Sequence, residues 1–588
     1  MIVKNEENNL DRCLNSVKNL VDEMIIVDTG SSDSTVKIAE KYGAKVFFFD
    51  WNNNFSDARN FSLKQAIGDW ILLMDADDQL DTADEHKIVP LLDDSHIEVY
   101  LFQTLSYVGK KPGLETVSNL NVRLIKNHRG YQFNGAIHEQ IVSNNVEINK
   151  SKVKIENIKI YHYGYLQPLY FEKNKPKRNM EILEKLLKND NNDSFHLFNM
   201  GNEYLRLRNY NKALEFYGKS YENFNPNAAF TSKLLLRMIL VLDKLNMTNE
   251  EMTMLDIGLK YYPKFTDLEY LRADLFHRQK KYTLAIKGYE KCMEMGDPPI
   301  HLTIINDVGT FKPSFALAEL YFDLEDYDEA YNYYIKALSA KPTYHLPIYR
   351  VADIFTKQNK EVQFIRTTLE GFFPEKSDSS VNIILGDIFF SQKRYDIALE
   401  FFIKAEVLLK DSPKLYYSIG MSYLYLKKYK DAYRYFEKNA GAYKEKSIYK
   451  MILCEILTKN FNNANILLTA SESYNHTLIK TVYEAFKNLM EGKTIEPISI
   501  DSKDEHLSII IILLDTLLNV ASPEIFEKAL HLLNLVENDE ALLMLAKLYY
   551  KNGYTNLAYQ EFIRSIKMFD KIDSQGLEIM TQIMSVCK

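Results

Sequence analysis

Hydrophobic and polar positions along this chain follow two different periods. Over residues 1 to about 165, short apolar runs alternate with amphipathic stretches, and from about residue 195 onward the apolar positions recur at helical spacing. The runs that predict buried strands are residues 23–27, 45–49, 71–74 and 158–161, and the stretches that predict helices are residues 34–42 and 56–66. This order predicts an α/β domain with a mostly parallel, Rossmann-like sheet and helices on both faces, followed by an all-α region.

The helical region repeats itself every 34 residues, the distance that separates Gly386 from Gly420 and Phe402 from Phe436. Each unit has a small residue, a second small residue twelve positions later and an aromatic residue four positions after that. The triplets are Gly201/Ala213/Tyr217, Ala273/Ala285/Tyr289, Ala318/Ala330/Tyr334, Gly386/Ala398/Phe402, Gly420/Ala432/Phe436 and Ala546/Ala558/Phe562. The pattern resembles the tetratricopeptide repeat, so we expect paired antiparallel helices with these aromatic side chains packed between them. Degenerate units are expected over residues 447–480 and 505–535.

The composition indicates which broad class of protein this chain belongs to. The chain has 588 residues, 46% hydrophobic and 26% charged, which is ordinary for a globular protein of three or four domain-sized units. The net charge of −8 argues against a nucleic-acid partner. The four cysteines are scattered, no apolar run reaches the roughly 18 residues of a membrane span, and the first residues lack the apolar core of a signal peptide. We therefore expect a cytoplasmic protein without a membrane span.

The segment Trp70-Ile-Leu-Leu-Met-Asp75-Ala-Asp77-Asp78 is the strongest candidate for chemistry. A short apolar strand runs directly into three carboxylates, which should gather at its carboxyl end, where ligands bind in open α/β sheets. Because like charges this close repel, a positive group has to offset them. Mg²⁺ or Mn²⁺ commonly bridges protein carboxylates to a diphosphate. The alternative interpretation is an acidic turn that only ends a strand.

Four motifs stand in order before residue 80: Met1-Ile-Val-Lys-Asn-Glu-Glu7, Ile26-Val-Asp28-Thr-Gly-Ser-Ser-Asp33, Asp57-Ala-Arg59-Asn60 and Leu73-Met-Asp75-Ala-Asp77-Asp78. Together they resemble family-2 glycosyltransferases of the GT-A fold over about residues 1–165. With its repeats the chain resembles a bacterial subgroup of that family, which Gly135-Ala-Ile-His138-Glu139 and His162-Tyr-Gly-Tyr165 also match. The first strand of the family usually begins several residues before Ile2, so we expect either a late start or a missing N-terminal piece.

The resemblance implies a nucleotide-sugar site. Its residues would be Asp28, Arg59, Asn60 and Asp75, with Lys175 and Arg178 reaching the diphosphate from the following helix. Asp28 would accept hydrogen bonds from uracil or ribose, and Arg59 would hold the base or a phosphate oxygen. The alternatives are a helix cap for Asp28, a surface ion pair for Arg59 and a solvated helix face for the two later residues.

The resemblance also implies a metal site and a catalytic base. Asp75, Asp77 and His162 would hold Mn²⁺ or Mg²⁺, Asp77 most directly. An inverting transferase needs a general base near the acceptor. Glu139 would be that base and His138 would orient the acceptor or a phosphate, with Asp78 as the rival base. The alternatives are a hydrogen-bonded loop at residues 138–139 and a simply packed His162.

The predicted organisation is a GT-A glycosyltransferase domain at residues 1–165, a linker helix at 166–192 and a tetratricopeptide-repeat solenoid at 193–588. The predicted function is metal-dependent, inverting transfer from a nucleotide-diphosphate sugar, UDP-linked by preference, to a peptide or protein held by the repeats. Tyr204, Tyr321 and Tyr423 are the predicted acceptor contacts. Two alternatives stay open: an enzyme that builds a cell-surface or lipid-linked glycan, and a repeat scaffold with an inactive transferase domain. The sugar, the acceptor atom and the oligomeric state, a homodimer included, are also open.

Overall fold

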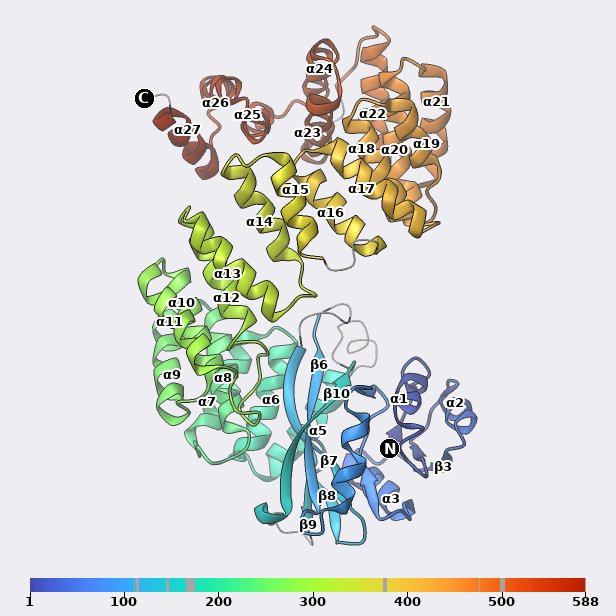
Figure 1. Ribbon diagram of the computed structural model, residues 1–588, viewed down its shortest axis with the longest axis vertical. Helices are drawn as coiled ribbons and strands as arrows, with labels where there is room; N and C mark the ends of the chain where they lie inside the picture. Colours follow the sequence, from blue (N-terminus) through green and yellow to red (C-terminus); the bar gives the residue numbers. More distant parts are fainter. Residues whose placement is uncertain are drawn as a thin grey trace. The chain divides into compact units, whose positions relative to one another are not determined.

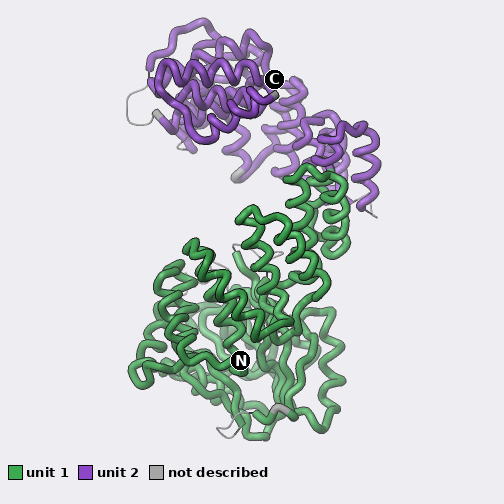
Figure 2. The backbone as a smooth tube through the Cα atoms, turned by 90° about the vertical axis from the view of Figure 1, so that its left-hand side faces the viewer, with its two compact units in different colours: residues 1–351 green, residues 352–588 purple. Residues whose placement is uncertain are grey.

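The computed structural model describes residues 1–109, 112, 116–143, 148–164, 175–373, 378–474, 476–497 and 503–586. The chain forms two compact units, residues 1–351 and 352–588, which are described separately (Figure 2). All strands of the described residues belong to the first unit. Across these ranges, no helix combines the length and the apolar character that crossing a bilayer requires. The boundaries predicted at residues 165 and 192 stay a prediction.

The first sheet of unit 1 is parallel, as the alternation of strands and helices predicted. Its order is β1 (Ile2–Val3), β2 (Ile25–Asp28) and β3 (Lys45–Phe48), with α1 (Leu10–Val17) and α2 (Thr35–Lys41) as the connections (Figure 1). Ile26 of β2 packs with Leu10 and Leu14 of α1 and Ala39 of α2, so burial of alternate apolar residues holds the helices on the sheet. The α/β fold class is confirmed.

The second sheet of unit 1 is mixed. Its order is β4 (Trp70–Leu72), β7 (Thr116–Lys126), β6 (Val99–Tyr107), β10 (Val153–His162) and β5 (Asp78–Leu80). β6 and β10 run parallel, and the other neighbours run antiparallel. The expected mostly parallel sheet therefore holds for β1–β3 alone. β6 and β7 are joined by a connection too short for a parallel crossover, which forces the antiparallel pairing.

A small hairpin beside these sheets carries the loop before Glu139. It consists of β8 (Tyr131–Asn134) and β9 (Gln140–Ser143), and it lies against α3 (Phe55–Gln65). The side-chain amide of Asn60 donates to the carbonyl of Phe133 at 2.9 Å, and the Phe133 N–H donates back to Asn60 Oδ1 at 2.7 Å. Asn60 thus fixes the hairpin to α3.

The predicted helical region is confirmed, beginning after α5 (Lys175–Asn189). In unit 1 its helices are α6 (Ser194–Arg206), α7 (Tyr210–Glu222), α8 (Thr231–Lys244), α9 (Thr248–Tyr261), α10 (Thr266–Arg278), α11 (Tyr282–Met295), α12 (Phe311–Asp323) and α13 (Tyr327–Ala340). α14 (Leu346–Lys357) contains the boundary between the units. In unit 2 the helices are α15 (Val362–Gly371), α16 (Ser379–Ser391), α17 (Tyr395–Leu408), α18 (Pro413–Tyr425), α19 (Tyr429–Glu437), α20 (Ala442–Leu457), α21 (Phe461–Ala470), α22 (Thr477–Met490), α23 (Lys503–Val520), α24 (Pro523–Leu530), α25 (Ala541–Lys551), α26 (Thr555–Phe569) and α27 (Ser574–Val586).

The small residues of the triplets let paired helices approach one another. The aromatic members, Tyr217, Tyr289, Tyr334, Phe402, Phe436 and Phe562, are each at most 1% exposed. A Cβ atom added at Gly201 would lie 2.5 Å from the Tyr217 ring, and one at Gly420 would lie 2.7 Å from the Phe436 ring. The predicted packing role of these aromatic side chains is confirmed.

We expect alanine at Gly201 to destabilise the α6–α7 pair, since the new methyl group must displace the Tyr217 ring. Overpacking of this kind costs about 1–3 kcal/mol. Gly218 of α7 is the matched control, because a Cβ there meets nothing within 4 Å. Gly218→Ala should stabilise the pair by about 0.4–1 kcal/mol. Hydrogen exchange of the α6 and α7 amides measures the stability of the pair in each variant. Faster exchange in Gly218→Ala as well as in Gly201→Ala would contradict the packing argument.

The repeats of unit 1 are joined to the mixed sheet by backbone pairing. Between α11 and α12, Ile305 forms an antiparallel bridge with Val117 of β7, and the Ser118 N–H donates to the carbonyl of Ile304 at 3.0 Å. The carboxylate of Asp267 accepts from the N–H groups of Ile304 and Ile305, at 3.2 and 2.6 Å. This segment of the solenoid therefore extends the edge of β7.

Candidate active site

Asp78 is the buried anchor of the acidic cluster. Its Oδ2 accepts from the backbone N–H of Asp75 at 2.8 Å and from Arg123 at 2.7 Å, and its Oδ1 lies 2.9 Å from His162 Nδ1. The side chain is fully buried. Both oxygens of Asp78 are therefore engaged inside the protein.

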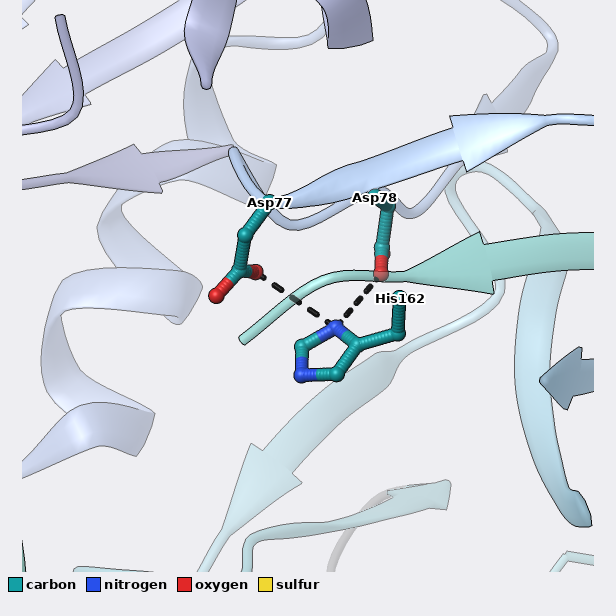
Figure 3. A group of neighbouring side chains, drawn as sticks. All are labelled: Asp77, Asp78 and His162. Atoms are coloured by element: carbon teal, nitrogen blue, oxygen red, sulfur yellow. Dashed lines mark hydrogen bonds and ion pairs between the residues drawn. The ribbon is translucent and has the colours of Figure 1, made fainter. Parts of the chain in front are cut away.

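Asp77 and His162 face one space at the carboxyl end of β10 (Figure 3). The register of β5 against β10 sets His162 opposite Asp78, and Asp77 Oδ1 lies 3.5 Å from His162 Nδ1. Ligand atoms of Asp77, Asp78 and His162 lie within 4.8 Å of one another. A Cβ atom at Gly164 would overlap Asp77 Oδ2 and lie 2.7 Å from His162 Nε2. Glycine thus keeps open the space that these two atoms face.

This donor set suits a divalent cation. Carboxylate oxygens suit Mg²⁺ and Mn²⁺, and imidazole nitrogen extends the choice to softer first-row metals. Nδ1 of His162 lies 2.9 Å from Asp78 Oδ1 and 3.5 Å from Asp77 Oδ1, so Asp78 orients the ring as outer-shell carboxylates do for metal-binding histidines, and Nε2 faces the space beside Gly164. The structure brings Asp77 and His162 together as predicted, with Asp78 rather than Asp75 as the third member.

Arg123 is a site residue that the sequence analysis missed. It comes from β7, is 5% exposed, and also donates to the carbonyl of Leu73 at 3.2 Å and to Thr104 at 3.2 Å. Its guanidinium supplies the positive charge that a group of neighbouring carboxylates requires. A charged residue within the apolar stretch Val122-Arg123-Leu124-Ile125 was the available signal.

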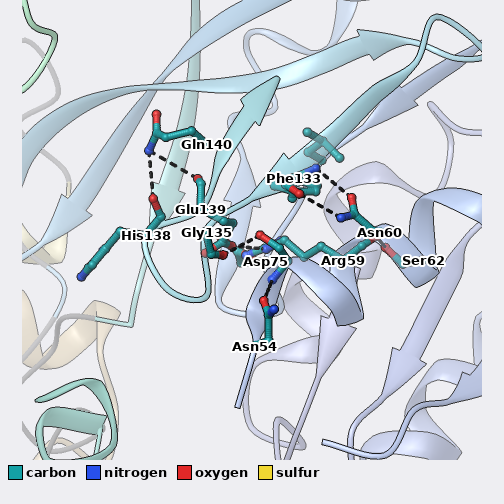
Figure 4. A network of polar contacts seen from close by, with 12 residues as sticks. Asn54, Arg59, Asn60, Ser62, Asp75, Phe133, Gly135, His138, Glu139 and Gln140 are labelled. Atoms are coloured by element: carbon teal, nitrogen blue, oxygen red, sulfur yellow. Dashed lines mark hydrogen bonds and ion pairs between the residues drawn. The ribbon is translucent and has the colours of Figure 1, made fainter. Parts of the chain in front are cut away.

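Arg59 of α3 bridges two of the predicted site residues (Figure 4). Its Nη2 donates to Asp75 Oδ1 at 2.7 Å, and its Nε donates to Glu139 Oε1. Burial acts to raise the pKa of Asp75, but the guanidinium groups of Arg59 and Arg123 outweigh it and hold that pKa well below its usual value. Arg59 thus forms ion pairs, but they are half-buried and not on the surface. They hold Glu139 beside Asp75.

His138 points away from this network, toward the repeats (Figure 4). It has a positive φ of 53°, and its Nε2 is buried with no hydrogen-bond partner among the described residues. Burial, followed by the charge of Arg206 on α6, lowers its pKa to about 4. Neighbouring Ile137 packs against Leu183 of α5 and Met200 of α6. The loop of His138 thus packs against α5 and α6, and the orienting role of His138 stays a prediction.

Asp28 lies at the end of β2, as predicted. Its Oδ1 accepts from the N–H groups of Gly30 and Ser31, both at 2.9 Å, which is the turn-capping role. Its Oδ2 is buried without a hydrogen-bond partner in the described part of the chain. One acceptor atom of Asp28 therefore remains for a ligand.

The remaining predicted residues lie on α5 or on the repeats. The side chain of Lys175 lies outside the described residues. Arg178 stacks on the ring of Phe55, 5.0 Å from its centroid, and donates to Asn179 at 3.2 Å. Tyr204, Tyr321 and Tyr423 are half-buried and stack on Phe216, Tyr333 and Tyr435 of the following helices, with centroid distances of 5.3, 5.6 and 5.6 Å. These three rings are thus occupied in packing within their repeats.

Comparison with known proteins supports both halves of this picture. Residues 1–146 match the family model described as glycosyl transferase family 2, and residues 313–344 and 413–438 match a tetratricopeptide repeat model. Both matches fall where the motifs of the sequence resembled these two families.

Three relatives illustrate the likeness. Glycosyltransferase SunS of Bacillus phage SPbeta is 29% identical over 281 residues, covering 46% of this chain and 65% of that protein. A TPR repeat-containing protein of Synechococcus elongatus is 29% identical over 246 residues, covering 41% of this chain and 60% of that protein. An uncharacterized glycosyltransferase of Rickettsia felis is 33% identical over 173 residues, covering 28% of this chain and 60% of that protein. The match thus spans less than two thirds of each relative.

Proposed function

We propose that this protein is an inverting glycosyltransferase that moves a sugar from a UDP-linked donor to a peptide or protein acceptor, with Mn²⁺ or Mg²⁺ bound. The observation that carries the proposal is that Asp77, Asp78 and His162 meet where β5 begins and β10 ends. Asp77 and Asp78 lie inside the segment that matches glycosyl transferase family 2, and His162 follows that segment in the sequence. The name of the phage relative, a glycosyltransferase, supports the same reaction class. The matched repeats support a polypeptide acceptor.

In this proposal Asp77 and His162 hold the cation, and Asp78 orients His162. The bound cation would stabilise negative charge on the diphosphate as it leaves. Asp28 Oδ2 would accept a hydrogen bond from the nucleoside, which suits its burial without a partner. Arg59 would hold Asp75 and Glu139 in place beside the sugar.

Glu139 is the proposed general base. A base has to come within hydrogen-bond reach of the acceptor proton. The carboxylate of Glu139 is half-buried, with a side chain 13% exposed, whereas that of Asp78 is fully buried with both oxygens engaged. This difference favours Glu139 over Asp78. Glu139 would take the proton from an acceptor oxygen or sulfur as that atom displaces the diphosphate at the anomeric carbon.

Thermal unfolding of the full chain tests the donor and the metal together. We expect UDP to raise the melting temperature in Mn²⁺ and to raise it much less in EDTA, because a ligand bound only by the folded state stabilises it. At about 100-fold excess over Kd the gain is about 2.7 kcal/mol. GDP and dTDP serve as matched nucleotide controls. An equal response to UDP in Mn²⁺ and EDTA would remove the metal from the proposal, and no response to any nucleotide would remove the proposal itself.

A further inference from the structure

A second cleft lies across the mixed sheet from the metal-binding group, wholly within unit 1. Its volume is about 830 Å³, within the range of ligand sites. One wall is the outer face of β6 and β10, and the other is the segment 297–307 between α11 and α12. Pro298 and Ile300 line the second wall. The cleft is therefore built jointly by the transferase sheet and the repeats.

Strand alternation separates the cleft from the metal-binding group. Along β10, Lys159 and Tyr161 line the cleft, whereas Ile158 and Ile160 enter the core on the opposite face, the face that carries His162. Tyr161 and His162 are consecutive, so the two sites share the carboxyl end of one strand. Tyr107 of β6 stacks on Tyr161 at a centroid distance of 5.7 Å and contacts Tyr163 at 5.0 Å. The tyrosine end of the cleft and His162 of the metal-binding group therefore lie at the same end of β10.

The spacing of the lining residues fits an extended polypeptide. Gln103, Leu105 and Tyr107 occupy every second position of β6, and Lys159 and Tyr161 do the same on β10. Side chains on one face of a strand repeat about every 6.6 Å, which is also the repeat of alternate side chains in an extended peptide. Apolar and aromatic side chains, among them Leu105, Ile155 and Tyr161, alternate in the lining with polar and charged ones, a mixture that suits an extended peptide bound through side-chain pockets.

The lining carries two lysines and two aspartates, and Lys159 is the one of these groups that favours an acidic side chain in the ligand. Lys341 is paired with Asp307 at 2.6 Å, and one oxygen of Asp297 accepts from the Gly309 N–H at 2.9 Å. Lys159 is half-buried, and its ammonium group forms no ion pair or hydrogen bond within the described residues. A carboxylate beside Lys159 would gain a charge-assisted hydrogen bond.

We propose that this cleft binds the acceptor as an extended polypeptide segment, with an apolar side chain against Tyr161 and an acidic side chain at Lys159. The inference rests on the proposed function and moves acceptor recognition from the concave surface of the repeats to their contact with the sheet. The residue to be modified would lie just beyond Tyr107, where the chain reaches the metal-binding group.

An array of short synthetic peptides probed with the full chain tests this assignment. The intact protein should prefer peptides in which an acidic residue lies near an apolar residue. Lys159→Glu should weaken binding to these peptides about tenfold or more and turn the preference toward basic peptides, because a like charge replaces an opposite one. Ile155→Trp should weaken binding to all of them, since Ile155 lines the cleft and is 40% exposed, so that the larger uncharged side chain is tolerated and fills the space.

Two matched variants serve as controls. Lys154→Glu reverses a charge on the same strand at an exposed lysine paired with Glu156, and Tyr554→Ala removes a tyrosine that is 46% exposed in unit 2. Neither should change the preference. An unchanged preference in both cleft variants, or binding of neutral oligosaccharides in place of peptides, would overturn the inference. UDP binding in Mn²⁺ is measured in parallel: if it persists, only the cleft assignment has failed, and if it is absent from the intact protein, the proposed function has failed.

Discussion

Replacing Glu139 with glutamine is expected to slow sugar transfer by about 10²- to 10⁴-fold, the usual contribution of a general base. Glutamine keeps an oxygen that can accept from Arg59 Nε, so the bridge to Asp75 should survive and nucleotide binding should change little. Water can take the place of the acceptor, so the protein should slowly hydrolyse its sugar donor. The measurement is the rate of UDP release, with the UDP-sugar that stabilises the protein most as the substrate.

The matched control is Glu156→Gln on β10. Glu156 pairs with Lys154 at 2.9 Å and lies outside the candidate active site, so this variant should release UDP at the normal rate. If Glu139→Gln also keeps near-normal turnover, Glu139 is a positioning residue for Arg59 and the base lies elsewhere. If it loses nucleotide binding together with turnover, the bridge and not the proton transfer was disturbed.

Two substitutions in the proposed metal site, at Asp77 and at Gly164, should each remove metal-dependent binding of UDP. Asp77→Ala removes a ligand oxygen, and Gly164→Ala places a methyl group against Asp77 Oδ2 and His162 Nε2. Each should abolish the part of UDP stabilisation that depends on Mn²⁺ and leave the part seen in EDTA. Thermal unfolding with UDP in Mn²⁺ and in EDTA measures both parts.

Asp93→Asn is the control for these two variants, because Asp93 is an exposed carboxylate at the end of a short 3₁₀ helix away from the cluster. It should respond to Mn²⁺ as the intact protein does. Undiminished metal-dependent stabilisation in Asp77→Ala would remove Asp77 from the site. If Gly164→Ala kept the metal-dependent stabilisation and Asp77→Ala lost it, the cation would lie away from the space that Gly164 leaves open.

Local patterns were enough to predict most of the fold. The apolar runs that become β2 and β3, the helix that begins near Phe55 and the repeat triplets all depend on neighbours in sequence, and each is found where it was expected. Strand pairing was harder, because the short apolar run before Asp75 says nothing about which strand lies beside it. The antiparallel neighbours of β4 and β10 made the second sheet mixed instead of mostly parallel.

The residue types of the candidate site were predictable from the sequence, but the directions of their side chains were less so. Asp75, Asp77 and Asp78 gather after β4, but which of them joins His162 depends on the register of β5 against β10, which no local pattern contains. The direction of the His138 side chain could not be predicted for a related reason. Its direction is set by contact with α5 and α6, residues that follow it by some forty to seventy positions.

The bridge between Val117 and Ile305 also has a consequence during synthesis of the protein. At about 5–20 residues per second, the ribosome needs roughly 10 to 40 s to pass from the first of these positions to the second. Throughout that interval this part of β7 lacks the partner that will cover it, and an unpaired strand edge is a template for pairing with other chains. The newly made mixed sheet therefore passes through a stage at which this edge is open to pairing with other chains, and a chain cut short before Ile305 would keep the edge unpaired.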